Sequence, residues 1–400
     1  MWFLDGKRYL RSMNKVSVPL LDSETIGFLR VPMALGVIFI HLGIRASGAD
    51  VAWFDMEGKD VFRLVVCVVT NELSALAVPT FFVVAGYLFF VGCDLARGGL
   101  LSFCGVKIRK RFRSLVVPYL VFNLLSMAGL LIAALMNGRS PGEAFASTFG
   151  GGRWLHCFWD AHTTGHSVNL FGISKATAYP INVPLWFVRD LIVLVLMSPM
   201  LVFAMKFLRR GWLWLVAACV ATGVWIPLPG FGVTSCMFFS MGAWVALNKG
   251  SLVNEARRHA AVVISLAVVL LLIDILADGT PVDSYVHLLF LVVGVVAVIC
   301  GASIYVERRL WPVGLVDRVG RRLVGQMSFF VFAIHAAVIP FWGMRPVEWV
   351  KSSVWSQAES GGVALVEYIC CGLLTFVVSV ALFVVLRRLC RPMIDFVTGR

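Results

Sequence analysis

The sequence predicts an all-α membrane protein with about ten transmembrane helices and both termini in the cytoplasm. Hydrophobic residues make up 60% of the 400 residues, charged residues only 14%, and the mean hydropathy is +0.88. A soluble domain carries about 25% charged residues. Apolar runs of about 20 residues, the length that crosses a bilayer, recur along the whole chain. These observations exclude a soluble protein.

The predicted spans are about 26–46, 74–93, 115–136, 183–204, 211–228, 231–248, 260–277, 284–305, 326–343 and 362–386. The run 61–73 (VFRLVVCVVTNEL) is too short to span separately, and we predict an interfacial lead-in to the second helix. No fixed-period repeat or appended soluble domain is visible, so residues 1–400 are expected to form one membrane domain. Residues 1–25 are its cytoplasmic N-terminal segment, 137–182 a large extracytoplasmic loop and 387–400 a short cytoplasmic tail.

The distribution of positive charge supports this topology. With the N-terminus inside, most of the 35 lysines and arginines fall in segments assigned to the cytoplasm. This is the bias that the positive-inside rule describes. The net charge of +13 therefore needs no nucleic-acid partner, and we expect none. We expect a multi-pass protein of the bacterial inner (plasma) membrane.

The long outer loop contains GGGRWLHCFWDAHTTGHS (150–167), rich in Gly, Trp and His. Trp rings suit the faces of sugars, but they also suit membrane interfaces. His156, His162 and His166 with Asp160 are side chains of the kinds that bind zinc, yet we predict no metal. The ten cysteines show no CxxC spacing, so we expect no disulfide framework.

The first predicted span, FLRVPMALGVIFIHLG (28–43), contains two ionisable residues, Arg30 and His41. Such residues cost several kcal/mol inside a membrane and indicate a functional site by default. Eleven residues at about 100° each bring both side chains to one helix face, roughly 16 Å apart along the axis. This suits an elongated substrate with its anionic end at Arg30 and its reactive end near His41. The alternative is an interfacial arginine and a histidine bonded to another helix.

The cytoplasmic end of the third span carries a run of basic residues within VKIRKRFRSLVVPYLVFNLL (106–125). Arginine binds phosphate bidentately, and lysine binds it as a point charge. The run is a candidate site for the phosphates of a nucleotide-containing donor, or a simple topology determinant. Its members are Lys107, Arg109, Lys110, Arg111 and Arg113.

Two further segments combine helix-packing features with polar residues. In AVPTFFVVAGYLFF (77–90), Gly86 allows a bend or a close approach of helices. PLWFVRDLIVLVLMSPML (184–201) contains Trp186 and the adjacent pair Arg189 and Asp190. Neighbouring side chains point in different directions on a helix, so we expect Arg189 and Asp190 to have separate partners. Packing and interface anchoring are the alternative roles.

Taken in order, these segments resemble acyltransferase family 3, ten-helix membrane proteins that move acyl groups, commonly acetyl from acetyl-coenzyme A, onto hydroxyls of sugars. The resemblance covers nearly the whole chain. It rests on the Arg-x(10)-His spacing of Arg30 and His41 and on the segments VPTFFVVAGYLFF, KRFRSLVVPY, PLWFVRDLI, CMFFSMGAWVAL and GQMSFFVFAIHAAVI.

The resemblance implies that Arg30 and His41 are the functional pair, with His41 essential to acyl transfer. It also implies that an Arg-x-x-Arg at the start of the third helix helps to hold the donor. This chain departs from that pattern, because its arginines alternate and the nearest matching spacing joins Lys110 to Arg113. The donor-binding candidates are therefore Arg30, Arg109, Lys110, Arg111 and Arg113.

Three residues are weaker candidates for substrate contact. His335 matches a histidine common in the penultimate segment of the family, and Trp186 lies at the outer end of its span. Glu72 lies either close to the outer mouth of the site or in the interface. Asp274 and Glu367 lie near predicted outer helix ends, where charges are cheap, and are assigned no role.

The resulting hypothesis is a membrane-bound O-acyltransferase. Acyl-coenzyme A, by default acetyl-coenzyme A, is its co-substrate on the cytoplasmic side, and no tightly bound cofactor is expected. The acceptor is a hydroxyl of a sugar, surface polysaccharide or lipid-linked glycan. His41 acts either as a general base or as a covalent acyl carrier. The rival hypothesis is a transporter or flippase for a lipid-linked or amphipathic solute.

Overall fold

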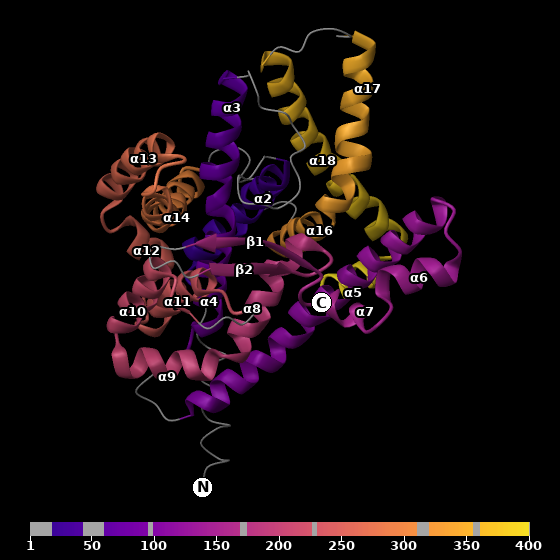
Figure 1. Ribbon diagram of the computed structural model, residues 1–400. Coiled ribbons are helices and arrows are strands. Elements are labelled where there is room, and N and C mark those ends of the chain that lie inside the picture. Colours follow the sequence, from indigo (N-terminus) through magenta and orange to yellow (C-terminus); the bar gives the residue numbers. More distant parts are fainter. Residues whose placement is uncertain are drawn as a thin grey trace.

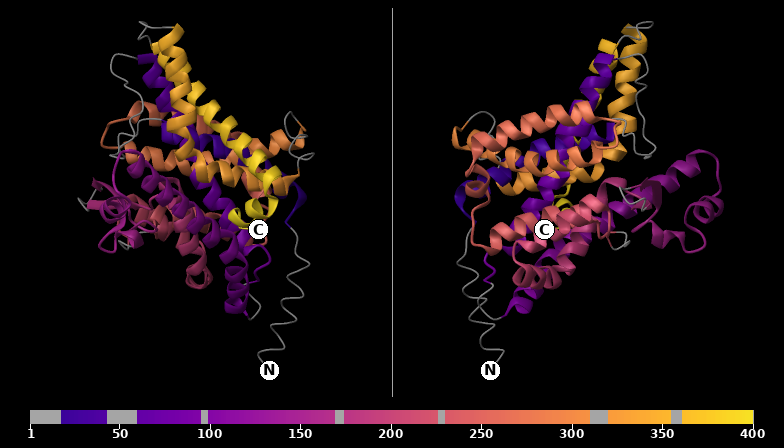
Figure 2. Two further views of the ribbon diagram at one scale, coloured as in Figure 1. Left: turned by 90° about the vertical axis from the view of Figure 1, so that its right-hand side faces the viewer. Right: turned by 60° about the vertical axis from the view of Figure 1, so that its left-hand side comes forward.

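The computed structural model describes residues 18–42, 60–94, 99–168, 174–225, 230–309, 320–354 and 361–399. Nearly all of this part of the chain is helical (Figures 1 and 2). The N-terminal half contains α2 (Leu20–Leu42), α3 (Asp60–Val66), η1 (Cys67–Leu73), η2 (Ser74–Leu76), α4 (Ala77–Phe90), α5 (Leu100–Met136), α6 (Pro141–Phe149), α7 (Arg153–His156), β1 (His162–Val168), β2 (Ser174–Tyr179), η3 (Val183–Leu185) and α8 (Trp186–Leu196).

The remaining elements are also helices. They are α9 (Ser198–Leu208), α10 (Gly211–Thr222), α11 (Val233–Leu247), α12 (Leu252–Arg257), α13 (Ala260–Ala277), α14 (Asp283–Glu307), α16 (Arg321–Val338), η4 (Ile339–Met344), α17 (Arg345–Val354), α18 (Gly361–Leu389) and α19 (Arg391–Val397). The helices α3, α17 and α18 lie side by side at one end of the molecule (Figures 1 and 2). The prediction of an almost wholly α-helical membrane protein is confirmed.

Seven helical runs in the described part of the chain are long and apolar enough to cross a membrane. An eighth is a broken span, in which α8 and α9 meet at an angle of 64°. The two shorter apolar helices α10 and α11 correspond to the other two predicted segments. The seven long runs are Leu20–Leu42, Val61–Phe90, Leu100–Met136, Ala260–Ala277, Asp283–Glu307, Arg321–Val350 and Gly361–Leu389. The number of ten spans and the orientation of the termini stay predictions.

The segment 61–73 is not a separate interfacial element. It forms the first half of one continuous helical run, Val61–Phe90, in which η1 is a π-helix and η2 a short 3-10 helix. The run is held to its neighbours by Thr70, whose hydroxyl donates to the backbone oxygen of Phe39 at 3.2 Å and lies 2.5 Å from Tyr368 Oη. These hydrogen bonds of Thr70 hold the stretch within the helix bundle.

Helices α4 and α11 pack in close backbone contact. A Cβ atom at Gly86 would overlap the backbone oxygen of Phe239, and one at Gly242 would overlap the backbone oxygen of Val83. Only glycine permits this approach, which is a common way for membrane helices to associate. The predicted close approach at Gly86 is confirmed, and it makes these two helices one rigid unit.

The start of α2 is anchored by the buried carboxylate of Asp22. This carboxylate accepts hydrogen bonds from Tyr87 Oη at 2.5 Å and Ser251 Oγ at 2.7 Å. It also accepts from the backbone nitrogens of Leu252 at 3.0 Å and Val253 at 3.1 Å, at the first turn of α12. Asp22 therefore joins α2 to α4 and α12, and it fixes the helix that carries Arg30 and His41.

The C-terminal helix α19 is tied to α16 and α18 by polar contacts. Gln326 Nε2 donates to Asp395 Oδ1 at 2.7 Å, and Arg387 Nη1 lies 3.5 Å from the same oxygen. The hydrogen bond from Gln326 lowers the pKa of Asp395, and the nearby arginines act in the same direction. The predicted tail thus begins as a continuation of α18 and ends as a docked helix.

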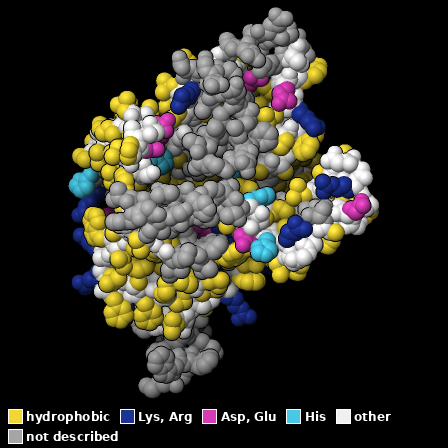
Figure 3. Space-filling view, viewed as in Figure 1, with side chains coloured by type: hydrophobic (Ala, Val, Ile, Leu, Met, Phe, Trp, Pro, Cys, Tyr) yellow, Lys and Arg dark blue, Asp and Glu magenta, His cyan; other side chains and the backbone are white. Residues whose placement is uncertain are grey.

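The surface is rich in hydrophobic side chains, which cover much of the face in Figure 3. On α13 alone, Val262, Leu266 and Leu276 are exposed. A soluble protein rarely exposes such continuous apolar area, whereas lipid solvates it without cost. The surface agrees with a multi-pass membrane protein.

Candidate functional site

The structure brings His41 and His335 together. They lie on α2 and α16, two helices that pack against each other, with ring centroids 5.0 Å apart and ring planes inclined by 48°. His335 is fully buried, whereas His41 is half-buried. The two histidines that the sequence placed in separate segments thus form one pair.

The hydrogen bonding of His335 defines which ring nitrogen carries its proton. Nδ1 lies 2.7 Å from the backbone oxygen of Phe332. Because a carbonyl oxygen only accepts, Nδ1 is the donor and Nε2 of the neutral ring bears the lone pair. Within the described residues Nε2 has no hydrogen-bond partner. The pair therefore contains a buried acceptor nitrogen beside the half-exposed ring of His41.

Arg30 lies on the same unbroken helix as His41, and it is half-buried. The spacing of eleven residues within α2 keeps both side chains on one helix face, as predicted. A second guanidinium group lies at this end of α2, where Arg321 Nη1 donates to Ser23 Oγ at 3.2 Å. The N-terminal half of α2 thus lies beside positive charge from two helices.

The basic run lies near the start of α5, where Arg109, Lys110 and Arg113 are exposed and Arg111 is half-buried. Lys107 has a structural role, because its Nζ donates to the backbone oxygens of Leu88 at 3.4 Å and Val91 at 3.3 Å. Lysine commonly satisfies the last carbonyls of a helix in this way. The other four basic residues of the run stay candidates for donor binding.

The prediction that Arg189 and Asp190 have separate partners is confirmed in part, because each has partners of its own and the two also pair with each other. Both side chains are buried, and Arg189 Nη2 lies 3.1 Å from Asp190 Oδ1. Arg189 also donates to the backbone oxygens of Trp159 at 2.6 Å and Ala178 at 2.9 Å, while Asp190 accepts from Ser235 Oγ at 3.0 Å. Burial favours direct neutralisation of the two charges. The pair fastens β2 and the turn at Trp159 to α8.

Trp186 and Glu72 do not join His41 in the contacts that the structure shows. Trp186 is half-buried and packs against the main hydrophobic core, with its ring centroid 6.4 Å from that of Phe82. Its neighbour Phe187 lies 5.8 Å from Phe332, close to His335 in the chain. Glu72 is buried elsewhere, beside a histidine of α14 that the sequence interpretation did not single out.

A shallow pocket of about 610 Å³ opens between the α9–α10 turn and the helices α11 and α12. Arg209, Arg210 and Arg258 line it together with Trp244. Three guanidinium groups and an indole are suited to an anionic ligand with an aromatic ring. The pocket was missed because its residues come from three helix ends that are separated in the sequence.

The histidine beside Glu72 is His287, within the predicted span 284–305. It was missed although an ionisable residue inside a span indicates function by the same rule that singled out His41. Asp274, to which no role was assigned, contacts His287 at 2.8 Å. In the contacts described above, Glu72, Asp274 and His287 lie apart from the pair formed by His41 and His335.

Comparison with known proteins agrees with this architecture. The family model described as an acyltransferase domain matches residues 24–384. The succinoglycan biosynthesis protein ExoH of Rhizobium meliloti (strain 1021) is 24% identical over 238 residues, which are 56% of this chain and 54% of that protein. The chain thus spans about half the length of this curated relative. No solved structure matches. Since the family model covers nearly the whole chain, this multi-pass membrane protein belongs to acyltransferase family 3.

Proposed function

We propose that the protein is an O-acyltransferase that moves an acyl group from acyl-coenzyme A to a hydroxyl of a glycan. Acetyl is the expected group, and the donor binds from the cytoplasmic side. The single observation that carries this proposal is the pairing of His41 with His335 on a helix face that also presents Arg30. Membership of an acyltransferase family supports the reaction class.

The donor fits this helix face as an elongated molecule. Its phosphates meet Arg30 and the basic run of α5, and its pantetheine arm extends toward His41. The separation of roughly 16 Å along α2 suits such an arm. The pocket lined by Arg209 and Arg258 is a second candidate position for the nucleotide end, favoured by its three guanidinium groups and Trp244.

His41 supplies proton transfer at the reacting end. As a general base, it accepts the proton of the acceptor hydroxyl while that oxygen attacks the thioester carbonyl, and the coenzyme A thiolate leaves and recovers the proton. As a nucleophile, its ring nitrogen first takes the acyl group and releases the thiolate. The hydroxyl then attacks the acyl-imidazole, the imidazole ring leaves, and the hydroxyl proton passes to the thiolate. Both routes give an ester and free coenzyme A.

The proposal also names the class of acceptor, a glycan hydroxyl. The name of the relative from Rhizobium meliloti refers to biosynthesis of succinoglycan, which favours a glycan acceptor here. The rival transporter hypothesis predicts solute flux that does not depend on coenzyme A. Acyl transfer instead requires one coenzyme A released for each ester formed.

The direct test uses the purified protein in lipid vesicles with radiolabelled acetyl-coenzyme A. We expect thioester turnover, or label trapped on the protein, in the wild type but not in His41→Ala. Arg30→Ala should weaken donor binding. His259→Ala removes an exposed histidine at the start of α13 and should behave as the wild type. Absence of acyl-coenzyme A binding in folded protein would overturn the donor assignment.

A further inference from the structure

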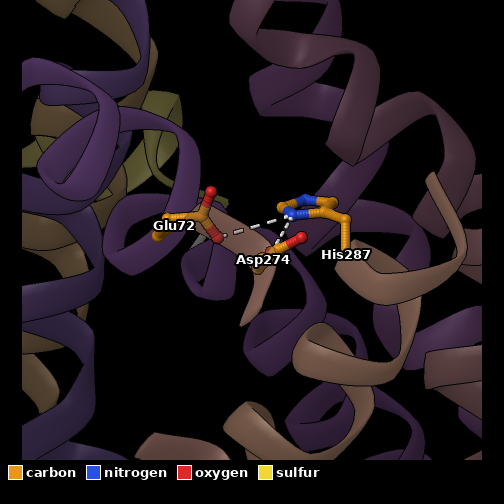
Figure 4. Close-up of side chains that lie close together, drawn as sticks. All are labelled: Glu72, Asp274 and His287. Atoms are coloured by element: carbon orange, nitrogen blue, oxygen red, sulfur yellow. Dashed lines mark hydrogen bonds and ion pairs between the residues drawn. The ribbon is translucent and has the colours of Figure 1, made fainter. Parts of the chain in front are cut away.

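Three side chains from distant parts of the sequence meet between η1, α13 and α14 (Figure 4). His287 Nδ1 lies 2.8 Å from Asp274 Oδ2 and 3.6 Å from Glu72 Oε2. One potential ligand atom from each of the three residues lies within 4.8 Å of the others. The acyl-transfer proposal uses none of them. We call Glu72, Asp274 and His287 the carboxylate–histidine cluster.

The cluster contains buried oxygen atoms whose hydrogen-bonding needs are not met. Glu72 is 4% exposed and Asp274 is 1% exposed. Glu72 Oε2, which faces His287, and Asp274 Oδ1 have no hydrogen-bond partner among the described residues. An unsatisfied carboxylate oxygen in a low-dielectric environment costs several kcal/mol. A single imidazole cannot supply enough donors, so the two carboxylates need either a shared proton or a cation between them.

The donor set matches a divalent transition metal. One imidazole nitrogen and two carboxylate oxygens are ligands that Zn²⁺ accepts, with bonds of about 2.0–2.2 Å. Tetrahedral ligands at such distances lie roughly 3.3–3.6 Å apart. The 3.6 Å between His287 Nδ1 and Glu72 Oε2 has this value, whereas the 2.8 Å between Nδ1 and Asp274 Oδ2 is a hydrogen bond that must lengthen when an ion binds. Calcium instead needs about 6–8 oxygen ligands. Two carboxylates and a neutral imidazole also balance the charge of a divalent ion.

The surroundings favour entry of a cation. Asp278 is exposed and Asp283 half-buried at the turn between α13 and α14, and both add negative charge beside Asp274. The side chain of His287 is 27% exposed, so one side of the cluster reaches the surface of the protein. Glu72 lies in the π-helix η1, and single-turn π-helices occur frequently at functional sites.

From these observations we infer that Glu72, Asp274 and His287 bind one Zn²⁺-like ion, with water completing its coordination. The ion ties the α13–α14 hairpin to η1. That helix is in turn bonded to α2 through Thr70 and the backbone oxygen of Phe39, two residues before His41. The site thus links the α13–α14 hairpin, through η1, to α2, the helix that carries His41. The three residues position α2 and do not contact the reacting atoms.

The test measures metal content and does not depend on acyl transfer. The full-length protein is purified in detergent, loaded with zinc, passed through metal-free buffer and analysed by mass spectrometry of elements. We expect one zinc per chain in the wild type and at least a tenfold loss of zinc affinity in His287→Gln and Glu72→Gln. His259→Gln is the matched control and keeps its zinc. Equal zinc in the wild type and in His287→Gln would overturn the site.

X-ray absorption of the zinc-loaded wild type gives a second result that needs no variant. We expect only nitrogen and oxygen ligands at about 2.0–2.2 Å, with the scattering of one imidazole. A shell that contains sulfur would place the ion on cysteines and overturn the proposal, since all ten cysteines are free thiols. A wild-type zinc content well below one ion per chain after loading would overturn it as well.

Discussion

The imidazole ring of His335 lies 5.0 Å from that of His41, centroid to centroid, although 294 positions separate them in the sequence numbering. Its Nδ1 donates to the backbone oxygen of Phe332, so its orientation is set within α16. A ring held in this way can hold its partner in a fixed orientation. We therefore interpret His41 as the reacting histidine and His335 as a positioning residue.

His41→Ala should remove acyl transfer. A positioned acid or base contributes a factor of about 10²–10⁴ to the rate, and a lost nucleophile costs at least as much. Release of free coenzyme A in the presence of acceptor measures the effect. Donor binding, measured by retention of labelled acyl-coenzyme A, should stay within about twofold of the wild type. Turnover at the wild-type rate would place the reacting group elsewhere.

His335→Asn tests the positioning role. The asparagine amide can still donate to the oxygen of Phe332, but it lacks the second ring nitrogen and most of the ring. We expect kcat to fall by roughly tenfold while KM for the donor is unchanged, because a misplaced base affects the transition state and not ground-state binding. The pH dependence of kcat should shift as well, since the partner ring of His41 changes. An unchanged pH profile together with wild-type kcat would show that His335 serves packing alone.

Charge removal on α5 and in the basic pocket should locate the donor phosphates. A hydrogen bond to a charged group is worth about 1.5–3 kcal/mol, or roughly 10–100-fold in affinity. Arg109→Ala and Arg113→Ala should raise KM for acyl-coenzyme A by such a factor if α5 holds the phosphates. Arg209→Ala and Arg258→Ala are the counterpart pair in the pocket. An effect confined to the pocket variants would move the nucleotide end there.

Asp22→Asn should destabilise the protein strongly. The amide keeps one accepting oxygen, so about two of the four buried donors lose their partner, each at a cost of about 1–3 kcal/mol. The apparent Tm in detergent measures the loss. Glu307→Gln is the control, because Glu307 is exposed and its ion pair with Arg257 at 2.7 Å lies at the surface, so the substitution should cost less than about 1 kcal/mol. Similar Tm values for both variants would contradict the anchoring role.

Gly86→Ala should disrupt the contact between α4 and α11. A methyl group there overlaps the backbone oxygen of Phe239, which cannot move without displacing the helix. We expect a loss of stability of about 1–3 kcal/mol or more, the usual cost of overpacking. Gly129→Ala on α5 is the matched control, since a Cβ there meets nothing within 4 Å. That substitution should be neutral or slightly stabilising, because alanine favours helix.

The positions of the helices could be predicted from the sequence, because the hydropathy pattern alone decides them. Apolar runs located the helices because lipid imposes a strict length and composition. The first helix nevertheless begins at Leu20 rather than near residue 26, since the tertiary contacts of Asp22 hold its polar first turn. Residues 43–46 of that predicted span lie outside the described part of the chain.

The site could be predicted only in part, for a related reason. The shared face of Arg30 and His41 follows from helix geometry within one segment. The pairing of His335 with His41 depends on how two helices pack, which no local pattern reveals. The same holds for Asp274 and His287. The direct ion pair of the adjacent residues Arg189 and Asp190 was not predicted, because burial in a common environment outweighed their different directions on the helix.

Helix α2 is held near both ends, by Asp22 at its start and by Thr70 at Phe39 close to its end. Such a helix has little freedom to slide or to rotate about its long axis. We therefore expect His41 to stay in place throughout a catalytic cycle. The two substrates must then travel to a stationary centre.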